Sequence, residues 1–262
     1  MKEKPFNVTS DPDFLFLSRV HKEAFSHLLY GIKEKKGFLQ ITGEIGAGKT
    51  TLCRALLKAL DRNIKSAFIF NSTLPELQLL QAVVEDYGLT VESRNKVTLL
   101  RQLNNFLIEE LSMGNNVILI IDEAQNLKPS ILEEIRMLSN LETEKEKLFQ
   151  IILVGQPELQ NRLNSPILKQ LKQRIAVRFH ISALEKDDVE RYIYHRLSVA
   201  GSNGQIRFPT DALDSIYNFS GGIPRLINMV CDKSLLAAYV METREITLPI
   251  VEKSIHELGG AM

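Results

Sequence analysis

The sequence has few cysteines, and their positions exclude a disulfide framework and a zinc site. Its 262 residues include only Cys53 and Cys231, which lie far apart and have no histidine or further cysteine nearby to complete a metal site. Both cysteines are therefore predicted to be buried free thiols. Free thiols persist in reducing compartments, which favours a cytoplasmic location.

Long apolar runs and net charge are absent as well. The strongest apolar run, residues 117–121, is far too short to span a bilayer, and residues 1–6 lack the apolar core of a signal peptide. The 32 basic and 32 acidic side chains cancel, so a nucleic acid or an acidic membrane must be bound by a local patch. With 44% hydrophobic and 24% charged residues, the composition is that of a soluble globular protein.

Short apolar runs alternate with amphipathic stretches through roughly the first 180 residues, which predicts an α/β layer fold. Strands are predicted over residues 38–42, 67–70, 117–121, 149–154 and 176–181. Ser18 is the predicted N-cap of a helix that runs through residue 32. Further helices are predicted after residue 49, from 75, near 98–111 and from 129. Because residues 117–121 are apolar throughout, we expect a parallel sheet covered on both faces.

After residue 183 the strand signals stop. Three or four helices are predicted, near residues 186–199, 210–219, 224–240 and 249–258. The predicted fold class is therefore α/β, with a five-stranded parallel sheet flanked by helices in a base domain of residues 1–183. A small all-helical lid domain, residues 184–262, follows it.

A glycine-rich loop joins the first predicted strand to the next helix. Residues 43–50 have the spacing Gly-x-x-x-x-Gly-Lys-Thr, the P-loop pattern, in which backbone N–H groups converge on phosphate oxygens. Lys49 is predicted to reach the β- and γ-phosphates of ATP, and Thr50 to supply a hydroxyl to Mg²⁺. The nucleotide-binding residues predicted here are Gly43, Glu44, Gly46, Ala47, Gly48, Lys49, Thr50 and Thr51.

Acidic residues end the apolar strand at 117–121. Asp122 is placed to bind the phosphate-bound Mg²⁺, and Glu123, one residue on, to polarise an attacking water. Acids also end strands as helix caps, but the P-loop upstream favours ATP hydrolysis. Gln156, after the fourth strand, is predicted to orient the same water or sense the γ-phosphate, and Asn71 to hold Glu123 in an inactive pose. Lone polar residues at strand ends are often turn or cap residues instead.

These motifs together resemble the AAA+ ATPases, and more closely the branch that contains the general secretion pathway protein A (ExeA/GspA-like) ATPases. The resemblance runs over nearly the whole chain, and its motifs are jointly specific to the branch. The segments that carry it are residues 4–6, 10–14, 42–51, 122–127 (Asp-Glu-Ala-Gln-Asn-Leu), 134–140, 155–159, 170–175 and 220–225.

The resemblance implies roles for two arginines. Arg174, before the last strand, matches the arginine finger that reaches a neighbouring subunit's site, where such a cation is worth roughly 10³ to 10⁵ in rate. Its alternative is a solvated cation at a helix end, which the helix dipole favours. Arg225, in Gly-Ile-Pro-Arg at the start of a lid helix, matches the sensor arginine that couples the γ-phosphate to the lid. A homo-oligomer, formed as a ring or on nucleotide binding, follows from the finger.

The chain also departs from this branch. Members often continue into a transmembrane helix and a periplasmic peptidoglycan-binding module, and this sequence ends without either, as a stand-alone cytoplasmic member or a fragment. Association with the inner face of the cytoplasmic membrane would then need a partner or a missing segment.

Three functional classes stay open. The first is an ATPase that drives assembly or remodelling of an envelope secretion or export apparatus with a cell-envelope protein partner. The second is a DNA-associated helper ATPase like the TniB-like proteins, for which Lys169, Lys172, Arg174 and Arg178 form the basic cluster. The third, a scaffold that binds ATP without turnover, is disfavoured by Glu123 and Arg174.

Overall fold

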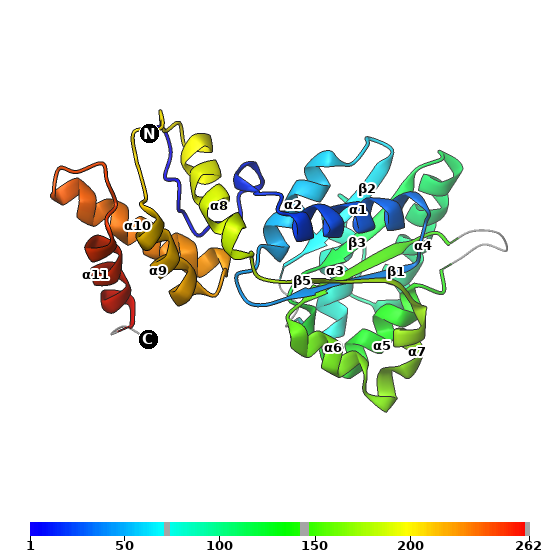
Figure 1. Ribbon diagram of the computed structural model, residues 1–262. Helices are drawn as coiled ribbons and strands as arrows, with labels where there is room; N and C mark the ends of the chain where they lie inside the picture. The colour runs from blue at the N-terminus through cyan, green and yellow to red at the C-terminus, as the bar shows by residue number, and fades with distance from the viewer. Residues whose placement is uncertain (71–73, 142–146, 260–262) are drawn as a thin grey trace. The chain divides into compact units, whose positions relative to one another are not determined.

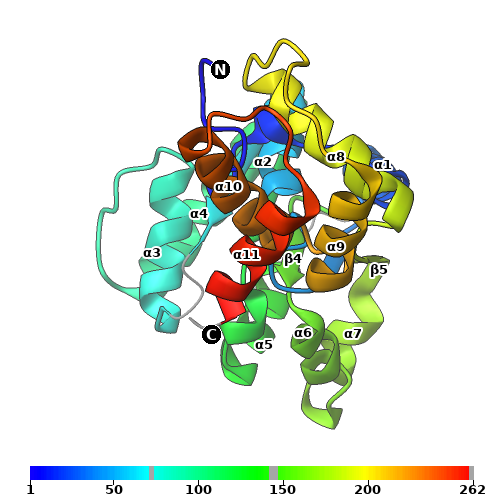
Figure 2. The same ribbon diagram turned by 60° about the vertical axis from the view of Figure 1, so that its left-hand side comes forward.

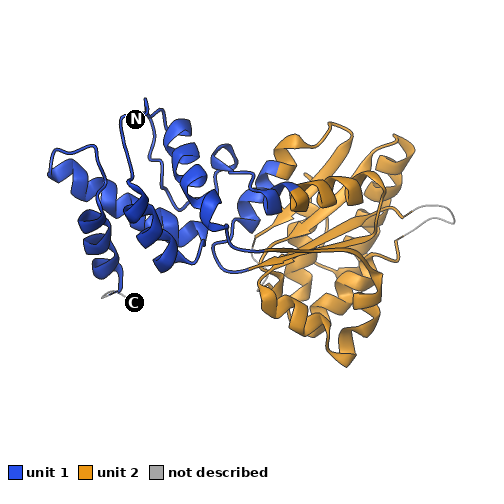
Figure 3. Ribbon diagram, viewed as in Figure 1, with its two compact units in different colours: residues 1–22, 44–55, 182–262 blue, residues 23–43, 56–181 orange. Residues whose placement is uncertain are grey.

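The computed structural model describes residues 1–70, 74–141 and 147–259. The chain divides into two compact units (Figure 3). The sheet unit comprises residues 23–43 and 56–181, and the helical unit comprises residues 1–22, 44–55 and 182–262. Two helices, α1 (Arg19–Lys33) and α2 (Lys49–Ala59), contribute residues to both units.

The sheet unit is built on five parallel strands in the order β2-β3-β4-β1-β5. These strands are β1 (Phe38–Gly43), β2 (Ile64–Ile69), β3 (Asn116–Ile121), β4 (Gln150–Gly155) and β5 (Ile175–Ile181). Every residue of β1 and β4 is buried, and β3 is buried from its second residue on, whereas the edge strand β5 alternates between buried and exposed positions. Continuous burial thus marks the central strands, as expected for a parallel sheet covered on both faces, although β1 includes the polar residues Gln40 and Thr42.

Helices cover both faces of this sheet, with α5, α6 and α7 together on one side and α1 on the other (Figures 1 and 2). The remaining elements of the unit are α3 (Glu76–Asp86), α4 (Lys96–Ser112), η2 (Ala124–Asn126), α5 (Pro129–Leu138), α6 (Pro157–Leu163), η3 (Pro166–Leu168) and α7 (Lys169–Arg174). Apolar side chains of β3 and β4 such as Leu119 and Leu153 join those of α3 to α7 in one core. This packing fixes the carboxyl ends of β3 and β4, where the polar residues of interest follow.

The helical unit contains α8 (Lys186–Val199), α9 (Thr210–Ser220), α10 (Pro224–Val240) and α11 (Leu248–Gly259), preceded in sequence by η1 (Pro12–Phe14). The N-terminal segment belongs to it because Arg196 of α8 bonds to its backbone. The guanidinium donates to the carbonyl oxygens of Pro5 (2.5 Å) and Asn7 (3.1 Å), and Phe6 is buried in the core of the unit. The guanidinium also lies 4.9 Å from the centroid of the Phe14 ring.

The predicted fold class is confirmed, with five parallel strands, flanking helices and a helical C-terminal region. The helices expected at 186–199 and 224–240 have those bounds, and both cysteines are buried free thiols. The strand expected at 67–70 covers 64–69, and α6 and α7 between β4 and β5 were not predicted. No helix among residues 1–70, 74–141 and 147–259 is long and apolar enough to cross a bilayer.

The domain boundary was predicted after residue 183, with all earlier residues in the base domain. Residues 182–262 do form part of one unit, but residues 1–22 and 44–55 group with them. Residues 44–55 also bond to the N-terminal segment within the helical unit, where Arg54 donates to Ser10 O at 2.9 Å. The assignment of base and lid roles to these parts remains a prediction.

Candidate functional site

The glycine-rich loop begins where β1 ends at Gly43 and stops where α2 begins at Lys49. Gly46 and Gly48 have φ angles of 82° and 94°, in the region that L-residues with a side chain rarely adopt. A Cβ atom on Gly46 would lie 2.4 Å from Cβ of Arg225, so glycine is required by space as well as by conformation. The two glycines therefore allow this loop conformation at the N-terminus of α2, the kind of position at which proteins bind phosphate.

Lys49 is folded back over this loop. Its Nζ donates to the carbonyl oxygen of Glu44 at 2.9 Å, and the residue is only 5% exposed. The backbone N–H of Ala47 donates to the same oxygen at 3.1 Å. A buried ammonium group at the N-terminus of α2 is placed to meet an anion, because both the charge and the helix dipole favour one there.

His21 of α1 holds the loop through a contact that the sequence did not predict. Its Nε2 lies 3.0 Å from the carbonyl oxygen of Ala47, and its Nδ1 lies 2.7 Å from Ser18 Oγ. Because a carbonyl only accepts, Nε2 carries the proton and Nδ1 of the neutral ring accepts from the Ser18 hydroxyl. Burial lowers the pKa of His21, opposed by the bond to Ala47, which favours this neutral state. Ser18 was predicted as a helix N-cap, and it also accepts from His21 N at 3.4 Å.

Arg225 meets the loop through its backbone. Its N–H donates to Gly46 O at 3.2 Å, and it occupies the second position of α10, after Pro224. The side chain of Arg225 is exposed. The helical unit thus brings together the predicted phosphate-binding residues 44–51 and the predicted sensor arginine, whereas Gly43 belongs to the sheet unit.

The acidic pair lies at the carboxyl end of β3, in the sheet unit. Asp122 is 2% exposed, its N–H donates to Ile69 O of the neighbouring strand at 2.9 Å, and its Oδ1 accepts from Glu123 N at 2.8 Å. Glu123 has φ 52° and ψ 35°, a left-handed conformation that is uncommon outside glycine and clusters at functional sites. The two consecutive carboxylates therefore follow different backbone conformations, and Asp122 bonds to the backbone of Glu123.

Gln156 lies beside Glu123, and its Nε2 donates to Glu123 Oε2 at 3.1 Å. It stands at the N-cap position of α6, as the alternative interpretation expected, but its side chain makes no capping bond. Gln125 is the residue that the sequence did not predict in the site. Its Nε2 donates to the same Glu123 Oε2 at 2.5 Å, and its Oε1 accepts from Gln156 N at 3.0 Å. Only its place in the Asp-Glu-Ala-Gln segment signalled it.

Arg174 does not contact this group. It ends α7, and its Nη1 donates to Ser139 Oγ, a buried hydroxyl after α5, at 2.7 Å. Of the other basic residues in its cluster, Arg178 donates through Nη2 to Lys172 O, and its side chain is exposed. Asn71, the proposed partner of Glu123, lies outside the described residues.

A magnesium ion fits the chemistry of these groups. Mg²⁺ takes one or two carboxylates, nucleotide phosphates and waters rather than a full protein cage. The buried Asp122 carboxylate and the Thr50 hydroxyl are oxygen ligands of this kind. The described part of the chain has no group of three or more His, Cys, Asp or Glu side chains that could hold a metal ion.

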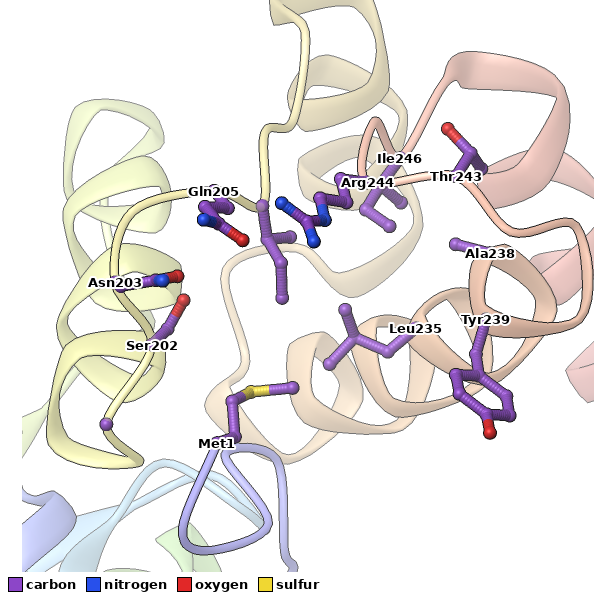
Figure 4. A pocket seen from close by; sticks show the side chains of 12 residues that line it. Met1, Ser202, Asn203, Gln205, Leu235, Ala238, Tyr239, Thr243, Arg244 and Ile246 are labelled. Atoms are coloured by element: carbon purple, nitrogen blue, oxygen red, sulfur yellow. The ribbon is translucent and has the colours of Figure 1, made fainter.

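The helical unit contains a cavity of about 400 Å³ (Figure 4). Met1, Asn203, Gln205, Leu235, Tyr239 and Arg244 are among its lining residues, and no carboxylate lines it. None of the predicted site residues contributes to this cavity.

The sheet order, the glycine loop at the start of α2 and the acidic pair after β3 define a P-loop ATPase of the AAA+ class. The family model described as AAA domain matches residues 32–163. The chain belongs to this family.

Relatives and solved structures agree with this assignment. The chain is 41% identical over 261 residues to General secretion pathway protein A of Aeromonas hydrophila, covering 99% of this chain and 48% of the relative. It therefore spans about half the length of this curated relative. Its fold is similar to the Aeropyrum pernix ORC2 protein in ADPNP and ADP complexes, with TM-score 0.76, 17% identity, and coverage of 98% of this chain and 72% of that one. The Thermotoga maritima RuvB Holliday junction branch migration motor matches with TM-score 0.61, 17% identity, and coverage of 97% and 73%.

Proposed function

We propose that this chain binds Mg-ATP at residues 43–51 and hydrolyses the β–γ phosphoanhydride, with Glu123 as the general base. The observation that carries the proposal is the Glu123 carboxylate. It is held in a left-handed turn after a buried strand by amides from Gln125 and Gln156, in a chain that has an intact P-loop. A carboxylate positioned in this way can accept the proton of an attacking water.

The roles of the loop follow from its geometry. The backbone amides of residues 46–50 bind the phosphate oxygens, and Lys49 exchanges its bond to Glu44 O for the β- and γ-phosphates. Thr50 and Asp122 would hold Mg²⁺, which when bound neutralises phosphate charge. Gln156 orients the water or senses the γ-phosphate, and Arg225 links the γ-phosphate to the helical unit.

Arg174 acts in a neighbouring subunit of a homo-oligomer under this proposal. To do so its guanidinium must leave Ser139 Oγ, and a bond to the charged phosphate replaces the bond to that neutral hydroxyl. The isolated monomer is then a slow ATPase, because it lacks the cation supplied by its neighbour.

We assign the ATP cycle to assembly or remodelling of an envelope secretion or export apparatus. The 41% identity to General secretion pathway protein A across almost the whole of this chain supports this assignment. A cytoplasmic location, at the inner face of the cytoplasmic membrane through a cell-envelope protein partner, accords with it.

A second candidate is a DNA-associated helper ATPase. It is supported by the exposed Arg178 beside Lys172 and by the fold shared with ORC2 and a RuvB branch migration motor. Because DNA binding depends on phosphate contacts by such cations, this candidate predicts an ATPase rate that DNA raises and salt suppresses.

Phosphate release from the purified protein tests both candidates. We expect Mg²⁺-dependent release that chelation abolishes, and stimulation by membranes or cell-wall fragments rather than by duplex DNA. Stimulation by DNA alone, lost in Arg178→Glu but kept in the control Arg62→Glu on the exposed turn before β2, would favour the second candidate. No Mg²⁺-dependent release under any of these conditions would contradict the proposed hydrolysis.

A further inference from the structure

Three polar groups of the sheet unit form a closed ring of hydrogen bonds. Gln125 Nε2 donates to Glu123 Oε2 (2.5 Å), Gln156 Nε2 donates to the same oxygen (3.1 Å), and Gln156 N donates to Gln125 Oε1 (3.0 Å). Each glutamine therefore contacts Glu123 and the other glutamine. A movement of the backbone at the end of β4 would therefore reach the Glu123 carboxylate through both glutamines.

The orientation of the Gln125 amide is fixed by its partners. A backbone N–H only donates, so the atom facing Gln156 N must be the carbonyl oxygen Oε1. The amino group Nε2 then necessarily faces the Glu123 carboxylate, which only accepts when it is ionised. A flipped amide would oppose donor to donor and acceptor to acceptor, so the ring specifies one arrangement.

Gln125 has little room to move. It is 7% exposed, and its Oε1 lies where a Cβ atom on Gly155 would be 2.7 Å away. Glycine at position 155 thus makes space for this amide against the end of β4. Gln156 is more exposed, and its side-chain bond to Glu123 is longer. In this ring Gln125 is the fixed partner and Gln156 the exchangeable one.

Two donors on one oxygen have a consequence for proton transfer. A carboxylate oxygen has two lone pairs, and both lone pairs of Glu123 Oε2 are engaged by amides. If the Gln156 side chain turns to a γ-phosphate oxygen, one lone pair of Oε2 becomes available to a water while Gln125 still holds the carboxylate. ATP binding would then add an acceptor site to the base without releasing the base from its position.

We propose that Gln125 is a positioning residue for ATP hydrolysis, which holds Glu123 in place while Gln156 exchanges between Glu123 and the γ-phosphate. The inference rests on the proposed function of Glu123. It assigns to Gln125 a role separate from substrate binding, because its contacts are to Glu123 and to the backbone of Gln156.

The first test replaces the amide by an apolar side chain of similar length. Gln125→Met should lower kcat about 10-fold to 100-fold, less than the loss of the base itself, with KM and ATP affinity within about 3-fold. Gln160→Met, on the exposed face of α6, is the matched control and should leave kcat unchanged. Because Gln125 and Gln156 act on one carboxylate, adding Gln156→Met to Gln125→Met should reduce kcat less than the product of the single effects.

A second variant keeps the inference testable if Gln125→Met does not fold. Gln125→Glu retains the size and the acceptor for Gln156 N, but its ionised carboxyl lacks the donor to Glu123. Protonation restores a donor, so the ratio of its kcat to that of the wild type should rise about 3-fold or more between pH 8 and pH 6. A merely structural role predicts a flat ratio.

The outcomes separate this inference from the proposed function. If the wild type hydrolyses ATP and Glu123→Gln does not, but Gln125→Met keeps the wild-type kcat or Gln125→Glu shows a flat ratio, the role of Gln125 is refuted alone. If the wild type itself does not hydrolyse ATP, the proposed function fails.

Discussion

The loop that carries Lys49 is held mainly by main-chain groups, whereas the carboxylate of Glu123 is held by side-chain amides. In the helical unit, Lys49, Ala47 and Arg225 all bond to or through backbone carbonyls of residues 44–47. In the sheet unit, Gln125 and Gln156 meet Glu123 side chain to side chain. A backbone cradle suits a ligand that is bound in one way, and a side-chain ring can exchange partners. Under the proposed function, the first region binds the nucleotide and the second changes its hydrogen-bond partners.

The largest expected effect is a loss of ATP affinity, caused by a substitution in the glycine-rich loop region alone. Lys49→Ala removes the buried ammonium at the start of α2 and should weaken ATP binding by at least about 100-fold, since a desolvated charge pair with phosphate is lost. Titration of a fluorescent ATP analogue measures this affinity. Lys65→Ala, an exposed lysine on β2, is the control and should bind as the wild type does. Unchanged affinity in Lys49→Ala would remove the loop from the site.

A mixing experiment tests whether a neighbouring subunit supplies Arg174 to the site that contains Glu123. Neither Arg174→Ala nor Glu123→Gln should hydrolyse ATP at an appreciable rate alone. Mixed in equal amounts, they should recover up to about a quarter of the wild-type rate per site, because some interfaces pair an intact Glu123 with an intact Arg174. Phosphate release against mixing ratio measures this recovery. A mixture as inactive as its parts would argue against an arginine supplied by a neighbour.

The steric requirement at Gly46 gives a smaller effect on stability. Gly46→Ala combines a left-handed φ with a Cβ atom 2.4 Å from Arg225 Cβ, and it should cost at least about 2 kcal/mol of unfolding free energy. Gly204→Ala, with φ 75° and no heavy atom within 4 Å of the added Cβ, is the matched control and should cost about 1 kcal/mol. Urea unfolding compares the two variants. Equal losses would show that the approach of Arg225 to the loop does not constrain it.

His21 gives the smallest effect, through pH. Burial lowers the pKa of His21 in the folded protein below the ordinary value of 6.5. Between the lowered pKa and 6.5 the unfolded chain binds more protons than the folded protein, so the free energy of unfolding falls as pH decreases below about 6.5. His195, whose pKa burial also lowers, adds to this slope. Urea unfolding between pH 5 and 7.5 should show a shallower slope for His21→Gln than for the wild type. Identical slopes would mean that protonation of His21 does not contribute to the pH dependence of stability.

The parts that the sequence predicted are those encoded by neighbouring residues. Residues 43–50 and the pair Asp122-Glu123 are local patterns, and the apolar run that became β3 stands out because the strand is buried on both faces. Helices such as α8 and α10 have clear ends and were predicted with the correct bounds. The short helices α6 and α7 were missed, since six or seven residues give too little periodicity to detect.

The two positioning contacts were missed for a different reason. Gln125 bonds to a backbone group 31 residues further along, and His21 bonds to one 26 residues further along. Neither spacing forms a sequence pattern. The partners are brought together by the order of the strands and by the course of α1, which the sequence alone does not specify. The sequence supplied the right residue types, and tertiary structure selected their partners.

The central claim is that the loop binds ATP and Glu123 makes its hydrolysis possible. It is tested most directly by the nucleotide that stays on the protein after a single addition of limiting Mg-ATP. The wild type should hold mainly ADP, whereas Glu123→Gln should bind the same amount of nucleotide and hold it as intact ATP. The control Glu92→Gln, an exposed residue, should match the wild type. Conversion to ADP by Glu123→Gln at the wild-type rate would contradict the account.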